Sequence, residues 1–345
     1  MIPYSGDHRI VTNDFSLDVP RGEYIALKHV TGGVVLDRQG AASVERGAFT
    51  SEIIRLGAAA TELILTWNCP APMNTLASVD FRVRAAGGEW SCWFQMGDWK
   101  SEKKQDRKSF DFIYGELKTD HFFAAGVFDE VQYRVVLRTA DYSQSPLLRR
   151  VTLCLSDTRD KKEVEPELFS GAAMDLPAPW LSQFDPDTVK DRVMMEAGVC
   201  AATSVTMVLK HHGMPANVRD VGRRAYDPSA DIYGNWAFLA AAAAEYGPAA
   251  WVQRFSDWRQ VESFITLGIP VIISIAYPKG TFSAEPDKET KGHLIVVRGF
   301  TATGDAIVND PGTADEKRGR GYVYPRLELG RAFFGHGGVG IIIKR

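Results

Sequence analysis

The position of one cysteine suggests that it could act as a nucleophile. Cys200 precedes an apolar run from Ala201 to His212 that has helical spacing, and Gly213 follows as a helix-ending residue. In the first turn of a helix, unpaired backbone N–H groups and the positive end of the dipole stabilise a thiolate, which is the nucleophilic form. The alternative is that Cys200 is a small buried hydrophobic residue, as cysteines without a disulfide often are.

A cysteine nucleophile needs a base beside the sulfur, a third group that orients the base, and donors for the developing oxyanion. His293 opens the strand-like segment GHLIVVRGF, and Asp310 ends the next one, where Pro311 prevents further pairing. If these strands are adjacent and end at the same level, Asp310 lies beside His293. Gln183 offers a side-chain amide as the oxyanion donor, together with the backbone N–H of Cys200.

Each of these residues also has an ordinary structural explanation. A histidine at the start of a strand is often only a satisfied polar residue. The NDPG sequence that contains Asp310 is a strong turn signal by itself. Gln183 could be a loop amide without a role in chemistry.

The order of these features resembles the C39-like cysteine peptidase family, within the papain-like group. The features are Gln183, Cys200 opening a helix, Gly292-His293 opening a strand, and Asn309-Asp310-Pro311 closing the next. The resemblance covers residues from about 176 to 345, and GHLIVVRGFTATGDAIVNDPG is its most specific part. The chain is also similar to two-domain bacterial members that carry an N-terminal β-sandwich.

The resemblance implies a papain-like α+β domain with a triad of Cys200, His293 and Asp310, and with Gln183 at the oxyanion hole. It implies hydrolysis of a peptide or related amide bond through an acyl-enzyme. Where the family usually has Gly and then Pro after the cysteine, this chain has Ala201 and Ala202. Two alternatives stay open: acyl transfer by the same triad, and a non-catalytic binding protein built on a peptidase-like scaffold.

The elements that must position these residues fall into two parts. Residues 1–157 predict an all-β, jelly-roll-like sandwich, because short segments rich in branched and aromatic residues alternate with turn signals. Residues 158–178 are charged and then Pro-rich, which predicts an exposed linker. Residues 179–345 mix helices and strands. The expected N-terminal strands are Glu23–Val30, Thr50–Leu56, Thr61–Trp67, Ser78–Arg84, Trp90–Met96, Val131–Thr139 and Leu148–Leu155.

The second part also contains recognisable helix starts. Asn217, Asn235 and Ser256 each precede a helical pattern and are predicted N-caps. The continuous apolar run Ile269–Tyr277 predicts a central strand buried on both faces.

Aromatic and basic side chains in residues 1–157 are compatible with a ligand-binding role. If Trp90 and Trp93 lie on one strand, they point to opposite faces, so at most one belongs to the core. They could form a platform for a glycan or a peptide, although a core tryptophan and one covered by a loop are the simpler explanation. The loop Trp99–Lys108 is mostly basic and predicts a solvated loop.

The overall composition narrows the choice of partners. The chain has 345 residues and a net charge of −3, which gives no electrostatic reason to expect nucleic acid or an anionic membrane. No apolar run is long enough for membrane insertion, and the N-terminus lacks a signal-peptide pattern, so we expect a cytoplasmic protein unless a leader has been removed. None of the four cysteines forms a CxxC pair, so neither a metal nor another cofactor is expected. The expected partner is a peptide or a peptide-containing polymer.

Overall fold

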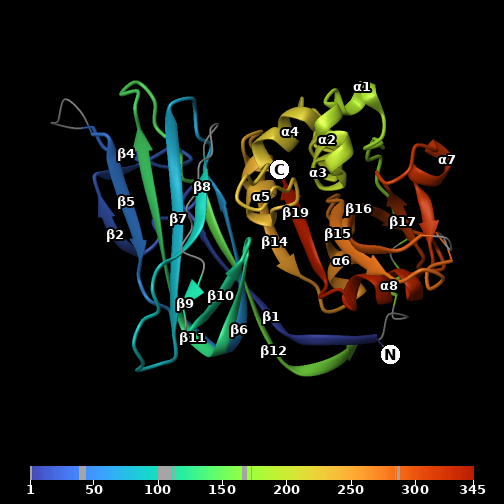
Figure 1. Ribbon diagram of the computed structural model, residues 1–345, viewed down its shortest axis with the longest axis horizontal. Coiled ribbons are helices and arrows are strands. Elements are labelled where there is room, and N and C mark those ends of the chain that lie inside the picture. The colour runs from blue at the N-terminus through green and yellow to red at the C-terminus, as the bar shows by residue number, and fades with distance from the viewer. Residues whose placement is uncertain are drawn as a thin grey trace.

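The computed structural model describes residues 2–38, 44–99, 110–111, 113–164, 169–171, 173–283, 285 and 288–345. Two units lie side by side (Figure 1): only strands occur in the described part up to Val164, and helices mix with strands from Met174 onward. The expected basic loop lies, apart from Trp99, outside the described residues. Within the described ranges, none of the helices is both long and apolar enough to cross a membrane.

The N-terminal unit is built around two long strands, β6 and β11. These strands pair with each other, and β6 also pairs with β12, while β11 pairs with β5, β7 and β10. The strands are β1 (Ile2–Asp14), β2 (Gly22–Ile25), β3 (Leu27–Val30), β4 (Gly33–Leu36), β5 (Arg46–Ser51), β6 (Ile54–Asn68), β7 (Thr75–Arg84), β8 (Phe94–Trp99), β9 (Phe110–Asp111), β10 (Gly115–Lys118), β11 (His121–Thr139) and β12 (Arg150–Val164).

The boundaries of some N-terminal strands differ from those expected. The segment Glu23–Val30 is divided between β2 and β3, because Ala26 adopts a left-handed backbone conformation with φ of 52°. The first strand, β1, was not expected, since its proline, glycine and aspartates are typical of turns. It forms through a long antiparallel pairing with β12, which itself continues to Val164, inside the expected linker.

The C-terminal unit contains an antiparallel sheet with helices on both faces. Its strand order is β14-β19-β15-β16-β17-β18, with β13 beside β16. Helices α3, α4 and α5 pack on one face, and α6 and α8 pack on the other. The elements are β13 (Met174–Asp175), α1 (Pro186–Val189), α2 (Arg192–Ala197), α3 (Cys200–His211), α4 (Val218–Ala225), α5 (Trp236–Ala244), β14 (Ala249–Arg254), α6 (Trp258–Thr266), β15 (Val271–Tyr277), β16 (Thr290–Phe300), β17 (Ala306–Asn309), α7 (Glu316–Gly319), β18 (Tyr322–Tyr324), α8 (Arg326–Phe334) and β19 (Val339–Lys344).

Local sequence signals account for several of these elements. The side chains of Asn217 and Asn235 cap α4 and α5, as predicted. The predicted cap of α6 at Ser256 is wrong: Asp257 caps this helix, because its carboxylate accepts the backbone N–H of Gln260. The run that becomes β15 is a buried strand between β16 and β19, as expected.

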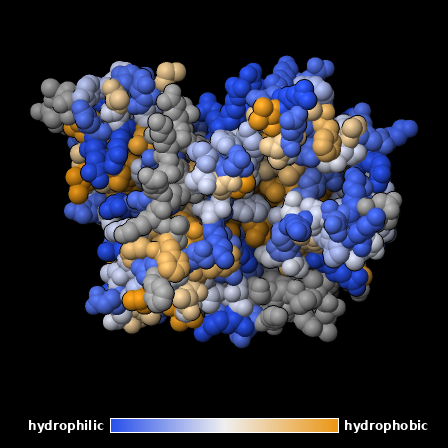
Figure 2. Space-filling model, in the orientation of Figure 1, coloured by the Kyte–Doolittle hydropathy of each residue, from blue (hydrophilic) through white to orange (hydrophobic). Residues whose placement is uncertain are grey.

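Helix α5 lies between the two units. Residues 237–244 of this helix are fully buried, and the helix contacts α3 and α4 on one side and β6 on the other. Its alanines make this possible, because small side chains allow close packing in two directions. The hydrophobic residues of the N-terminal unit and those of the α3–α5 layer therefore form one continuous core cluster. Hydrophilic residues cover most of the face seen in Figure 2, with smaller apolar patches.

Side chains of the N-terminal unit hold both ends of α5. The Asp120 carboxylate accepts the backbone N–H of Trp236, at the start of the helix. Glu245, directly after the helix, accepts the indole N–H of Trp99 at 2.9 Å and the backbone N–H of Ala71 at 3.0 Å. These bonds fix the helix layer of the C-terminal unit to the strands of the N-terminal unit.

Trp90 and Trp93 form part of a stacked ladder. The prediction that they point to opposite faces of a strand is wrong, because both residues precede β8 and lie outside any strand. The guanidinium of Arg82 stacks on both rings at 4.6 Å, Arg84 stacks on Trp90 at 4.4 Å, and Arg134 stacks on Trp93 at 4.6 Å. Each guanidinium is also held across the β7–β11 pair, Arg82 by Gln132, Arg84 by Glu130 and Arg134 by Asp80. Each indole is thus packed against two arginines.

We predict that Asn68→Ala destabilises the whole chain and not the N-terminal unit alone. The buried Asn68 amide accepts the N–H of Ala250 at 3.0 Å and donates to its carbonyl at 2.6 Å, so the substitution leaves two buried backbone groups unpaired. The expected loss in the free energy of unfolding is about 2–4 kcal/mol. Calorimetry should show one cooperative transition at lower temperature, while the exposed control Glu52→Ala stays within about 0.5 kcal/mol of wild type. Two separate transitions, of which only one moves, would contradict the shared core.

Candidate active site

Cys200 is the first residue of α3, as the sequence predicts. Val199 precedes it and offers no side-chain cap, so side chains leave the first N–H groups of the helix uncovered at this end. The cysteine is partly exposed, whereas Ala201 and Ala202 are buried in the core cluster. The Cβ of Ala201, where the family resemblance leads us to expect glycine, is therefore packed inside the protein.

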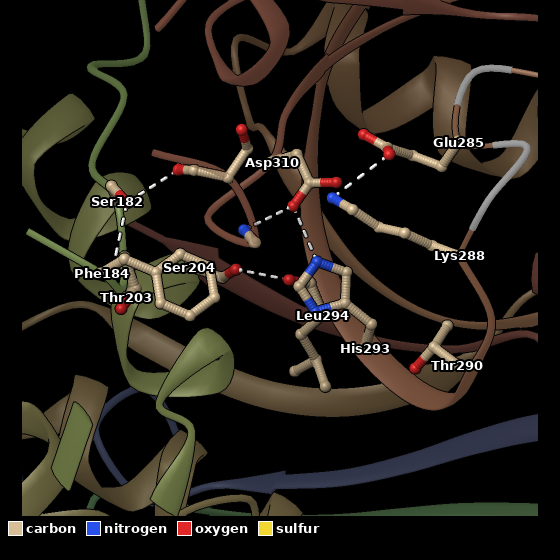
Figure 3. A network of polar contacts seen from close by, with 12 residues as sticks. Ser182, Phe184, Thr203, Ser204, Glu285, Lys288, Thr290, His293, Leu294 and Asp310 are labelled. Carbon is tan, nitrogen blue, oxygen red and sulfur yellow. Dashed lines mark hydrogen bonds and ion pairs between the residues drawn. The ribbon is translucent and has the colours of Figure 1, made fainter. Parts of the chain in front are cut away.

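The peptide groups of Leu294 attach β16 to α3. The Leu294 carbonyl accepts the hydroxyl of Ser204 at 3.1 Å (Figure 3). The backbone N–H of Leu294, after His293, helps to lower the pKa of the Cys200 thiol. Ser204 is fully buried and lies one helical turn after Cys200. The Ser204 bond ties the start of α3 to the strand that carries His293.

His293 and Asp310 meet across β16 and β17. His293 is the fourth residue of β16 and not its first, and β17 ends at Asn309, one residue before Asp310. Asn309 faces Val296 in the antiparallel register, which places Asp310 near the His293 end of β16. The ring nitrogen Nε2 of His293 bonds Oδ1 of Asp310 at 2.7 Å (Figure 3).

The carboxylate of Asp310 receives two further hydrogen bonds. The backbone N–H of Gly312 donates to Oδ1 at 2.6 Å, and the hydroxyl of Tyr324 donates to Oδ2 at 2.7 Å. Burial alone would raise the pKa of Asp310, but the charge and hydrogen bond of His293, together with these donors, lower it to about 2. Sequence reasoning missed Tyr324. A buried tyrosine usually has a hydrogen-bond partner for its hydroxyl, and this general rule is the only signal in the sequence that could have pointed to Tyr324.

Gln183 lies beside the loop that follows Asp310. Its backbone N–H donates to the carbonyl of Pro311 at 3.0 Å, and the neighbouring Ser182 hydroxyl donates to Thr313 at 2.7 Å. Its side-chain oxygen is buried and has no hydrogen-bond partner among the described residues. The backbone of Gln183 is therefore held beside the loop that follows Asp310, and its side-chain oxygen is left without a bond to the described protein.

Asn309 and Trp180 join the same two segments from the other side. In the sequence, Asn309 stands out only as part of a motif, and Trp180 does not stand out. The Asn309 amide donates to the carbonyls of Ala178 and Pro179 at 3.0 and 3.1 Å. The indole of Trp180 donates to the backbone carbonyl of Asp310 at 2.7 Å. The segment that leads to Gln183 is thus tied to the end of β17.

The titration of Cys200 and that of His293 are shifted in opposite directions. Burial would raise the pKa of the Cys200 thiol, but the hydrogen bond and charge of His293 lower it below its ordinary value. Burial would lower the pKa of His293, but Asp310 and Cys200 raise it well above its ordinary value. Both shifts favour the charged form of the group, a thiolate at Cys200 and an imidazolium at His293.

The other histidines and cysteines lie elsewhere. His211 and His212, at the end of α3, donate to the backbone carbonyls of Gly268 and Ile343. All four cysteines lie in the described part of the chain, and none is joined in a disulfide. Among the same residues, no group of three or more His, Cys, Asp or Glu side chains is arranged to hold a metal ion.

Comparisons with solved structures find only weak similarity. A structure assigned to the C39-like peptidases, from Bacillus anthracis, is 15% identical, with a TM-score of 0.36 over 50% of this chain and 98% of that chain. A structure of infectious bursal disease virus, Gx strain, is 9% identical, with a TM-score of 0.21 over 45% of this chain and 34% of that chain. No curated protein sequence matches.

Family models give the stronger result. Residues 16–156 match the model described as the peptidase C39 N-terminal domain. Residues 176–328, which include Gln183, Cys200, His293 and Asp310, match the model of the peptidase C39-like family. The two models together span most of both units, and the chain belongs to the C39-like peptidase family.

Proposed function

We propose that the protein is a cysteine peptidase that hydrolyses a peptide or related amide bond. The observation that carries this proposal is the combination of a partly exposed thiol at a helix start, an imidazole that lowers the pKa of that thiol, and a buried carboxylate bonded to the imidazole. Burial raises the pKa of a purely structural cysteine and keeps its thiol neutral, so such a cysteine needs no cation beside it.

In the proposed mechanism, the Cys200 thiolate attacks the carbonyl carbon of the scissile amide. The carbonyl oxygen becomes an oxyanion, which accepts hydrogen bonds from the Gln183 amide and the backbone N–H of Cys200. Because Nε2 of His293 is bonded to Asp310, the other ring nitrogen, Nδ1, is the one that gives its proton to the leaving amine. The C–N bond then breaks and leaves a thioester.

Water completes the reaction. His293 Nδ1 removes a proton from water, the hydroxide attacks the thioester carbonyl, and the carboxylic acid leaves while the thiolate is restored. Asp310 holds the imidazole in one orientation and stabilises its charged form throughout. If an amine replaces water in this step, the same triad transfers the acyl group. Product analysis with an added amine distinguishes these two outcomes.

We also infer that the N-terminal unit is a jelly-roll-like sandwich that stabilises the peptidase unit. The first half of β11 pairs with β6 and β10, and its second half pairs with β5 and β7, as expected for a strand that passes from one layer to another. Because arginines stack on Trp90 and Trp93, a glycan or peptide at this unit would bind the edges of these rings and not their faces.

We predict that iodoacetamide alkylates Cys200 rapidly at pH values well below the ordinary thiol pKa of about 8.5. In His293→Ala, the pKa of Cys200 should rise above that value, because burial and the negative charge of Asp310 remain while the cation is lost. Mass spectrometry of the Cys200 peptide, with the Cys92 peptide as an internal reference, measures the rate at each pH. A wild-type Cys200 that titrates near the ordinary value would favour a non-catalytic scaffold.

We predict that Cys200→Ala abolishes cleavage of a peptide library followed by mass spectrometry. Gln183→Ala should reduce kcat/KM by about 10²–10³-fold, mainly through kcat, because the donor is needed chiefly in the transition state. The exposed residue Asp187, close to Gln183 in the sequence, provides a control as Asp187→Asn, which should leave cleavage unchanged. Cleavage that survives in Cys200→Ala would refute the assignment of the nucleophile.

A further inference from the structure

The two oxygens of the Asp310 carboxylate have different partners. Oδ1 accepts His293 Nε2 at 2.7 Å and the N–H of Gly312 at 2.6 Å. Oδ2 accepts the hydroxyl of Tyr324 at 2.7 Å. Without the phenol, Oδ2 would lack a hydrogen bond from the described part of the protein, and the carboxylate could rotate about its Cβ–Cγ bond. The tyrosine therefore determines which oxygen faces the imidazole.

Tyr324 is well placed to act only as a donor. It is 1% exposed at the end of β18, and its ring packs edge-on against Phe282 with 4.9 Å between centroids. Burial and the negative charge of Asp310 raise the pKa of its phenol far above the ordinary value, so the hydroxyl keeps its proton. A protonated phenol bonded to a carboxylate must donate to it.

We propose that Tyr324 is a positioning residue that fixes the Asp310 carboxylate toward His293, an inference that rests on the proposed peptidase function. Tyr324 contacts neither the sulfur nor the imidazole in the described hydrogen bonds, and it acts through Asp310. By holding Oδ2, it keeps Oδ1 aligned with Nε2 of the ring, and it helps this buried carboxyl group to stay ionised.

Several other charged or titratable groups surround this pair and must be considered in any pH experiment. On the strands, His293 faces Asp310 from β16, and Tyr277 lies nearby on β15. Burial and the charges of Asp310 and Glu285 raise the pKa of the Tyr277 phenol to about 12. Cys200 approaches from α3. Glu285 is buried, and it is neutralised by Lys288 at 3.2 Å and Arg318 at 3.1 Å. Asp310 is thus the one member of this set whose titration depends directly on the Tyr324 donor at acid pH.

The test compares Tyr324→Phe with Tyr322→Phe in the full chain. Tyr322 lies two residues earlier on β18 and has no hydrogen bond to Asp310 in the described structure, so it is a matched control. The readout is the rate of iodoacetamide alkylation of Cys200 from acid to neutral pH, together with the Tm of each variant. In Tyr324→Phe, the ring that packs on Phe282 is kept. Each variant loses only a hydroxyl group, so both should fold.

In Tyr324→Phe, we expect the acid limb of the alkylation profile to move to higher pH by about one unit. The buried carboxyl then gains a proton at a higher pH, and the imidazolium loses its partner. At the midpoint of the wild-type limb, the rate should fall about fivefold relative to both wild type and Tyr322→Phe, and the ratio should approach about tenfold at lower pH.

The outcomes separate the two proposals. A normal wild-type profile with an unmoved limb in Tyr324→Phe, even if Tm falls, overturns the positioning role and leaves the peptidase proposal intact. A wild-type Cys200 that titrates at the ordinary thiol value overturns both. An equal shift in Tyr322→Phe would attribute the effect to general loosening of β18 and would also refute the role of Tyr324.

Discussion

The structure depends on how one helix is fixed to one strand. The buried Ser204 of α3 donates its hydroxyl to the Leu294 carbonyl of β16, and the helix packs along this strand, so the start of α3 is tied to the strand that carries His293. The shift in the thiol pKa requires this closeness, because the Cys200 thiolate must be stabilised by a charge in contact with it. The buried Asp310 then stabilises that charge from the other side of the imidazole ring.

The rest of the chain supports this arrangement through α5. This helix is buried along most of its length, and it packs against α3 on one side and the N-terminal strands on the other. Removing the N-terminal unit would expose an alanine-rich apolar helix and would leave Glu245 without its partners Trp99 and Ala71. The N-terminal unit is therefore part of the folded core that positions Cys200.

The sequence predicted the local parts of the site better than the contacts between them. Short-range rules about spacing and turn chemistry account for the helix start at Cys200, the order of His293 and Asp310, and the caps at Asn217 and Asn235. Tyr324 could not be predicted, because its hydrogen bond depends on where β18 is placed relative to the end of β17. Strand β1 was missed for a similar reason: its residues are poor strand formers, and its distant partner β12 determines its conformation. The stacking of Trp93 also depends on Arg134, which lies far away in the sequence.

The central claim concerns the ionisation state of one sulfur atom, and the ultraviolet absorbance of the thiolate measures it directly. The difference between wild type and Cys200→Ser should show one thiolate per chain at neutral pH, which persists into mildly acid solution and is lost in His293→Ala. A difference spectrum with no thiolate at neutral pH would contradict the account, because the helix, the imidazole and the carboxylate would then fail to stabilise the charge.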